Sequence, residues 1–124
     1  MDLHGHSSKK NIFSYGPDYE VSDPNFYTAR LFPKVIGLNS KYFKYDSCTF
    51  KLEEHKKSTA RGFFLSELEV MTYTIESSYS MYEDEEGKLQ LMEVDDWKGF
   101  GIDLLKSLLL ILKAVQGNKA KNAK

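Results

Sequence analysis

The sequence has one cysteine and almost no net charge, and each of these scarcities excludes a class of protein. Cys48 alone cannot form an internal disulfide or a zinc site built from several cysteines, which is typical of a protein from a reducing compartment. The formal net charge is -1, so the composition gives no support to a protein that wraps nucleic acid with a basic surface.

Signals for secretion and membrane insertion are missing as well. The first ten residues contain no apolar stretch of signal-peptide length. The longest uninterrupted apolar run is 108–112, far shorter than the roughly 20 residues that a helix needs to cross a bilayer. The sequence of 124 residues therefore predicts a single cytoplasmic domain of ordinary size, with no membrane partner.

The charges that are present are unevenly distributed. The segment 34–61 holds seven basic and three acidic residues, whereas 83–96 holds seven acidic residues and one basic residue. Because clustered carboxylates repel one another and need water, 83–87 is predicted to be an exposed turn. The basic middle segment is the more informative feature, since an acidic substrate would need such a surface.

Residues rich in β-branched and aromatic side chains alternate along the chain with residues at helical spacing, which predicts an α/β fold. Met1 to His6 is interpreted as a strand end that runs into a loop. Strands are predicted at 11–15, 48–52 and 70–75.

Three helices are predicted. Asp23 followed by Pro24 is a helix start, and Pro33 indicates an end or a kink of that helix. Residues 59–68 fit helical spacing slightly better than strand spacing. The strongest helix is 99–115, with Gly117 as its C-terminal cap.

Two histidines, His4 and His6, lie close to the predicted strand end. Histidine is the commonest metal ligand, and Asp2 could hold such a ring in orientation. A glycine beside an imidazole at a strand end suits a cleft. The alternative from spacing alone is an ordinary surface pair.

Glu76 and Arg61 are the other candidates for chemistry. Glu76 ends an apolar strand, where a glutamate beside a metal-bound water could act as a general base. The alternative is a solvated residue at a strand edge. Arg61 could bind a carboxylate with two parallel hydrogen bonds, and the alternative is an exposed helix arginine.

Four segments of the chain, in the same order, resemble motifs of the cytosolic carboxypeptidases. These are zinc metallocarboxypeptidases, several of which remove glutamates from tubulin tails. The resemblance extends from residue 2 to about residue 113. Its motifs are DLHGHSSKKNIFSYG at 2–16, ARLFP at 29–33, KSTAR at 57–61 and YTIES at 73–77.

The resemblance implies a role for each candidate residue. His4 matches the last of the family's three zinc ligands. Glu76 matches the catalytic glutamate that activates the zinc-bound water and passes its proton to the leaving amine. Arg61 matches a position near the specificity pocket, where a cation would favour acidic side chains. His6 is implied to shape the adjoining subsite. We therefore expect His4 and Glu76 to face a common cleft, at the ends of neighbouring strands.

The implied fold is the C-terminal half of a carboxypeptidase α/β domain, a mixed sheet between helices. Residues 1–115 would form this part, and 116–124 a flexible basic tail. No His-x-x-Glu motif, which carries the family's other zinc ligands, occurs in the sequence, and no glycine follows Glu76 closely. Because catalytic zinc normally needs three protein ligands, we expect this chain alone to be inactive.

Two functional interpretations remain open. In the first, the chain is part of a zinc metallocarboxypeptidase that removes C-terminal residues, glutamates in particular, from acidic protein tails such as those of tubulin. In the second, it is a non-catalytic remnant that binds acidic tails without cleaving them. Neither involves nucleic acid or a membrane.

Overall fold

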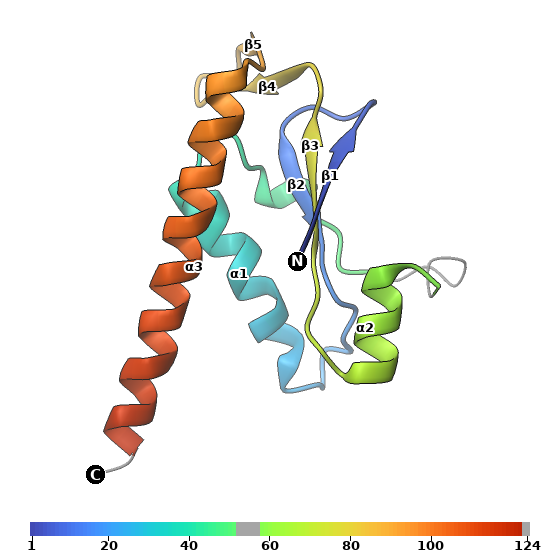
Figure 1. The fold of residues 1–124 in the computed structure, drawn as a ribbon, viewed down its shortest axis with the longest axis vertical. Coiled ribbons are helices and arrows are strands. Elements are labelled where there is room, and N and C mark those ends of the chain that lie inside the picture. Colours follow the sequence, from blue (N-terminus) through green and yellow to red (C-terminus); the bar gives the residue numbers. More distant parts are fainter. Residues whose placement is uncertain (52–57, 123–124) are drawn as a thin grey trace.

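The computed structural model describes residues 1–51 and 58–122. The described residues form a small mixed sheet, a hairpin and helices on both sides of the sheet (Figure 1). In chain order the elements are β1 (Asp2–His6), β2 (Ile12–Tyr15), α1 (Asn25–Asn39), the 3-10 helix η1 (Tyr45–Ser47), α2 (Ala60–Leu68), β3 (Thr74–Ser78), β4 (Met81–Glu83), β5 (Leu89–Leu91) and α3 (Val94–Asn122).

The strand β3 lies in the centre of the three-stranded sheet, whose order is β1-β3-β2. It pairs with β1 in parallel and with β2 in the antiparallel sense, so the sheet is mixed. The strands β4 and β5 form a separate antiparallel hairpin. Together with the helices, this arrangement confirms the predicted α/β class. In the described part of the chain, no helix is long and apolar enough to cross a membrane.

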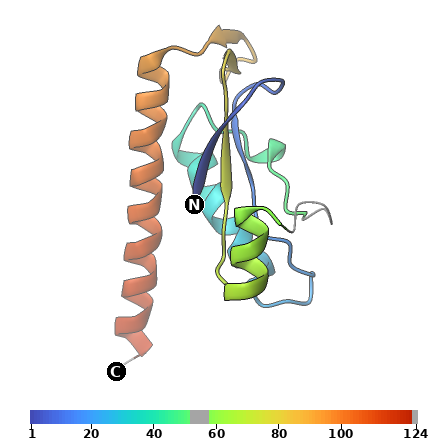
Figure 2. The ribbon, with the colours of Figure 1, turned by 45° about the vertical axis from the view of Figure 1, so that its right-hand side comes forward.

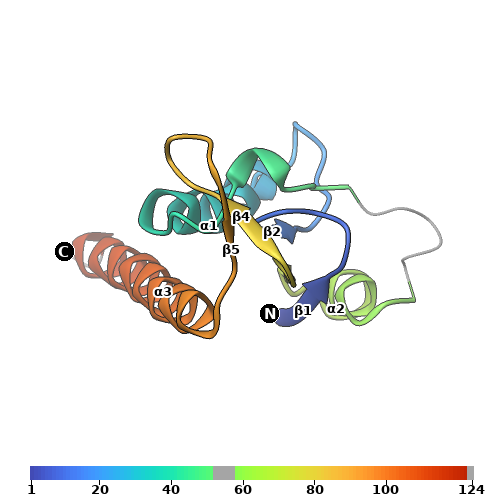
Figure 3. The ribbon, with the colours of Figure 1, turned by 90° about the horizontal axis from the view of Figure 1, so that it is seen from above.

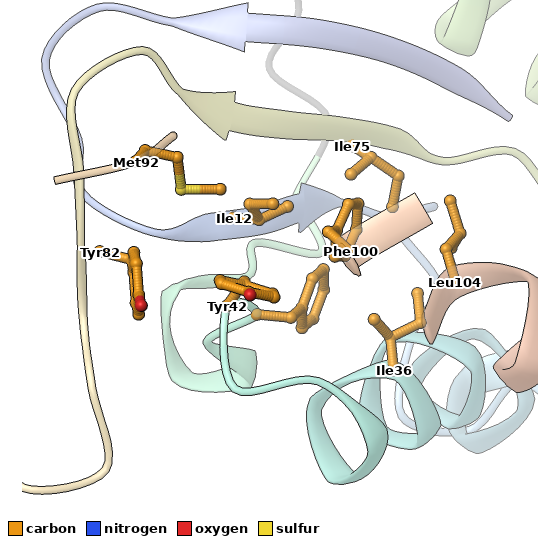
Figure 4. Close-up of a cluster of buried hydrophobic side chains, with 9 residues drawn as sticks. Ile12, Ile36, Tyr42, Ile75, Tyr82, Met92, Phe100 and Leu104 are labelled. Carbon is orange, nitrogen blue, oxygen red and sulfur yellow. The ribbon is translucent and has the colours of Figure 1, made fainter. Parts of the chain in front are cut away.

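The hydrophobic core lies between one face of the sheet and the helices α1 and α3. Ile12 and Ile75 contribute from the sheet, Ile36 from α1, and Phe100 and Leu104 from α3 (Figure 4). The helix α2 lies on the opposite side of the sheet (Figures 1 and 3). Because side chains alternate along a strand, the face opposite the core is left for other contacts.

The helix α1 does not end at Pro33, one of the two outcomes that the sequence predicted, but continues to Asn39. A proline cannot donate the helical hydrogen bond to the carbonyl four residues earlier, here that of Ala29. The hydroxyl of Tyr73 donates to that carbonyl instead, at 2.8 Å. Burial raises the pKa of Tyr73, so its hydroxyl stays protonated and remains a donor. A side chain from the segment before β3 therefore replaces the missing bond and attaches α1 to the sheet.

Two predicted strands differ from the structure. Within the described residues 48–51 there is no strand, and Thr49 forms only an isolated bridge with Tyr15. Leu52, the last residue of that prediction, lies outside the described residues. The strand predicted at 70–75 begins only at Thr74 and continues to Ser78. The reason is that Val70 donates its amide to the end of α2, at the carbonyl of Phe64.

The remaining elements follow the sequence more closely. The segment 60–68 is helical, and the Thr59 side chain accepts a hydrogen bond from the amide of Gly62 as an N-terminal cap. The acidic turn is exposed at 85–87 and joins β4 to β5, a hairpin that the sequence did not reveal. The predicted helix end at Gly117 was wrong, because α3 spans Val94–Asn122. One glycine costs a helix only about 1 kcal/mol, which good helix formers around it can offset.

The bond between Tyr73 and Ala29 gives a direct test of this fold. We expect Tyr73→Phe to lower the free energy of unfolding by about 1–3 kcal/mol, because it leaves a buried carbonyl without a donor. Pro33→Ala would supply an amide to the same carbonyl, so the loss should be smaller in that background. Urea unfolding of the four proteins in this double-mutant cycle measures the difference.

The matched control is Tyr27→Phe, which removes a hydroxyl from the same helix α1 at a side chain that is 74% exposed. We expect it to leave the unfolding midpoint unchanged. Equal losses from Tyr73→Phe with and without Pro33 would mean that the hydroxyl does not replace the proline's missing bond.

Candidate active site

The pairing of β1 with β3 places His4 beside Glu76. The two residues are direct partners in the parallel register. Partners in a parallel pair project to the same face of a sheet, and here it is the face opposite Ile75 and the core. The expected proximity is therefore present, although both residues lie in the middle of their strands and not at the ends.

A cavity of about 370 Å³ opens on this face of the sheet. His4 and Glu76 both line it, so the two residues share one cleft as expected. The helix α2 closes one side through its first turn, which contributes Arg61. The remaining lining residues are Asp2, Tyr15, Thr59, Ala60 and Thr74.

Asp2 orients the imidazole of His4. The carboxylate Oδ2 of Asp2 lies 2.9 Å from Nε2 of His4, and the side chains are about half exposed. Two residues apart on one strand, these side chains project to the same face. A neutral His4 that donates from Nε2 keeps the lone pair on Nδ1, which is the atom that would bind a metal. This is the orienting contact that metal-binding histidines commonly make.

Arg61 is buried, with only 7% of its surface exposed, so it is not the exposed helix arginine of the alternative interpretation. Its Nη1 donates to the carbonyl oxygen of Gly16, just beyond β2, at 2.5 Å. Burial lowers the pKa of Arg61, and the negative potential of Tyr15 and Asp18 acts in the opposite direction. Arg61 therefore attaches α2 to the end of β2 and also brings a positive charge to the cavity.

His6 is not among the lining residues of this cavity. Its Nδ1 accepts hydrogen bonds from the amides of Ser8 and Lys9, at 3.2 and 3.1 Å. Its ring also packs edge-on against Phe13, with 5.4 Å between the ring centroids. These contacts hold the turn between β1 and β2. Lys9 belongs to the same turn. Its Nζ lies 4.5 Å from the centre of the Phe13 ring.

The sequence did not single out Tyr15 and Thr74 as lining residues. The alternation of side chains along 11–15 puts Tyr15 on the same face as Phe13. It does not say which face that is, because the answer depends on the pairing with β3. Thr74 pairs with Asp2 and with Tyr15, and this row lies next to the row of His4 and Glu76.

The described residues do not make a metal centre by themselves. No group of three or more histidine, cysteine, aspartate or glutamate side chains in residues 1–51 and 58–122 could hold a metal ion. His4 is a single candidate ligand, and catalytic zinc normally takes three from the protein. A zinc site at this position requires ligands beyond those described.

The chain is similar to known proteins both in sequence and in fold. No family model matches the sequence. The chain is 30% identical to mouse cytosolic carboxypeptidase 2 over 109 residues, which is 87% of this chain and 12% of that protein. It is 34% identical to chicken cytosolic carboxypeptidase 1 over 93 residues, or 62% of this chain and 7% of that protein. It is 33% identical to human cytosolic carboxypeptidase 6 over 84 residues, which is 66% of this chain and 16% of that protein.

The fold is similar to that of a metallo-carboxypeptidase from Burkholderia cenocepacia. The TM-score is 0.66 at 12% sequence identity, and the match covers 91% of this chain and 30% of that chain. The fold match and the sequence matches point to the same kind of protein. Because the match to mouse cytosolic carboxypeptidase 2 covers 87% of it, the chain belongs to the cytosolic carboxypeptidase family.

Proposed function

We propose that this chain forms part of the active site of a zinc-dependent metallocarboxypeptidase that removes C-terminal glutamates from acidic protein tails, such as those of tubulin. The observation that carries the proposal is the register pairing of His4 with Glu76 in a cavity that also contains Arg61. The names of the relatives support the reaction class and a cytoplasmic location. The glutamate preference rests on the chemistry of the cavity.

In this proposal Glu76 moves the proton of the reaction. Its carboxylate accepts a proton from the attacking water and later gives it to the nitrogen of the leaving amino acid. Glu76 lies in the middle of the central strand, whose ends are Thr74 and Ser78, and its backbone is held between β1 and β2. A rigid strand is a suitable support, since a general base must stay within hydrogen-bond reach of its substrate.

Arg61 supplies the preference for acidic residues. Its permanent charge and forked donors suit a carboxylate, and its burial strengthens the interaction by excluding water. Lys51 is exposed and adds positive charge at the start of the segment that precedes α2. Lys56 and Lys57, two further basic residues of the segment 34–61, lie outside the described residues. His6 acts on the adjoining subsite indirectly, through the turn that it holds.

The second candidate function is a non-catalytic module that binds acidic tails through the same basic cavity wall. The observation in its favour is that the described residues contain no cluster of metal ligands. The two functions differ in whether Glu76 matters. Catalysis requires its carboxylate, whereas binding of an acidic tail would be weakened by it.

Glu76→Gln tests the proposed function. The test protein is mouse cytosolic carboxypeptidase 2 in which this chain replaces the matched 109 residues. We expect Glu76→Gln to lower kcat about 10²- to 10⁴-fold on a glutamate-ended peptide, because the amide cannot take the proton. Zinc content should not change. The control is Glu83→Gln in the hairpin, and a variant at Glu76 that keeps full activity would contradict the proposal.

Arg61→Lys tests the substrate preference in the same chimera. Lysine keeps the charge and loses the fork, so one charge-assisted hydrogen bond, worth about 1.5–3 kcal/mol, should be lost. We expect kcat/KM to fall about ten- to a hundredfold on a glutamate-ended peptide and much less on a phenylalanine-ended one. Thermal unfolding monitors the loss of the contact with Gly16. Equal losses on the two peptides would assign Arg61 a purely structural role.

The chain of 124 residues alone provides a third test. We expect it to retain less than one equivalent of zinc through dialysis and to show no carboxypeptidase activity, because metal affinity follows the number of ligands. Atomic absorption after dialysis measures the zinc, with His4→Ala as the matched control. Stoichiometric zinc in the parent and not in the His4→Ala variant would show that the chain carries a complete site.

A further inference from the structure

Lys9 and Lys10 are neighbours in the turn between β1 and β2, and they differ in their partners. Nζ of Lys10 lies 3.2 Å from Oε2 of Glu83 in the hairpin. Lys9 takes part in none of the ion pairs among the described residues. Its ammonium group lies instead over two aromatic rings, 4.5 Å from the centre of Phe13 and 5.8 Å from the centre of Tyr15. The turn therefore carries a positive charge with which no carboxylate of the described residues pairs.

The rings next to Lys9 project from the face of the sheet that carries Glu76. Phe13 is the antiparallel partner of Glu76, and partners in such a pair project to the same face with their Cβ atoms about 5 Å apart. Phe13 itself is fully buried, and the side chains of His6 and Lys9 are among those that cover it. Because the strand order is β1-β3-β2, Lys9 lies on the side of Glu76 that is away from His4.

Arg61 and Lys9 approach this face from its two ends. On the side of the sheet away from α3, α2 lies toward one end of the strands and the turn between β1 and β2 toward the other (Figure 2). Thr72, just before β3, donates to the carbonyl of Arg61, so α2 is attached at the start of this strand. Cζ of Arg61 lies 5.8 Å from the centre of the Tyr15 ring, the same ring that Lys9 approaches from the turn. The row of Glu76 therefore lies between the two cations.

Lys9 also lines a second cavity, of about 400 Å³, on its other side. Lys10 and Glu83 belong to this cavity and pair with each other. The other charged residues of its lining are Lys9, Lys44 and Asp46, so positive charge prevails there. An acidic segment that passes Lys9 would therefore continue into a cavity that suits it electrostatically.

We propose that Lys9 determines specificity in the proposed carboxypeptidase, by binding the side-chain carboxylate of the residue that precedes the substrate's terminal glutamate. The inference rests on the proposed function and extends its acidic preference from one residue to two. In an extended peptide, neighbouring side chains point in opposite directions and the peptide bond lies between them. A substrate whose terminal glutamate points to Arg61 and whose preceding glutamate points to Lys9 thus has its last peptide bond beside Glu76.

The aromatic rings hold the charge of Lys9 in place without neutralising it. A ring attracts a cation through its quadrupole and has no net charge, so the ammonium group can still donate to a carboxylate. Lys9 is exposed, and water and salt therefore screen the pair that it would form. The expected preference is for this reason modest and dependent on salt.

Two peptides that differ only in the residue before the last test the proposal, one ending in Glu-Glu and the other in Gln-Glu. The test protein is mouse cytosolic carboxypeptidase 2 in which this chain replaces the matched segment. We expect kcat/KM to be about three- to fivefold higher on the Glu-Glu peptide. Lys9→Met should abolish this difference, because methionine covers Phe13 without a charge. Lys9→Arg should preserve the difference, Lys9→Glu should reverse it, and high salt should reduce it.

Lys10→Met is the matched control, since it removes the adjacent charge that is already paired with Glu83. We expect this variant to keep the difference between the two peptides. Arg61→Lys should lower kcat/KM on both peptides, because they share the terminal glutamate. A purely structural role of Lys9 would lower the two values alike and leave their ratio as it was, and this result would overturn the proposal.

The outcomes also separate this proposal from the proposed function. A chimera whose activity depends on Glu76 but is equal on the two peptides would support the enzyme and overturn the role of Lys9. If the chimera has no activity, NMR titration of the 124-residue chain with the same peptides decides. Tighter binding of the Glu-Glu peptide that is lost in Lys9→Met would then support Lys9 and contradict the enzyme. Equal binding, or no binding of either peptide, would overturn both.

Discussion

The pairing of β3 with both of its neighbours is the constraint on which the rest of the structure depends. It puts His4, Glu76 and Phe13 in one row across the sheet. A slip of β3 by one residue against both neighbours would turn Glu76 to the core face and Ile75 to the cavity. Ile75, which is 2% exposed, opposes such a slip because it belongs to the core between the sheet and the helices. The packing of one face thus determines the chemistry of the other.

The sequence predicted the parts of this arrangement that local patterns encode. The strand at 11–15, the helix at 59–68 and most of α3 follow from alternation, capping and helical spacing. The grouping of His4, Glu76 and Arg61 came from the resemblance and not from periodicity, since these residues lie far apart in the chain. The structure brings all three to one cavity. The roles assigned to them remain predictions.

What the sequence could not predict depends on contacts between distant segments. A proline inside a helix removes one hydrogen bond, and here a hydroxyl from Tyr73, forty residues away, bonds to the carbonyl left without a donor. Residues 48–51 have the composition of a strand, yet their pairing with β2 is an isolated bridge between Thr49 and Tyr15, and the Cys48 side chain accepts the amide of Ser14. The burial of Arg61 depends on Gly16, which lies 45 residues away in sequence. Each of these requires knowledge of the partner as well as of the segment.

In the proposed function Arg61 would combine stability with recognition, and the two demands would limit each other. A buried guanidinium needs hydrogen-bond acceptors, and the carbonyl of Gly16 supplies one while Asp18 contributes an opposite charge nearby. A carboxylate that enters the cavity must therefore compete with groups that already hold the cation. Such competition lowers affinity for every acidic ligand, but it keeps the side chain in place before the substrate arrives. Because the bond to Gly16 already holds the guanidinium, the selectivity proposed for the cavity would come from the fixed orientation of its fork.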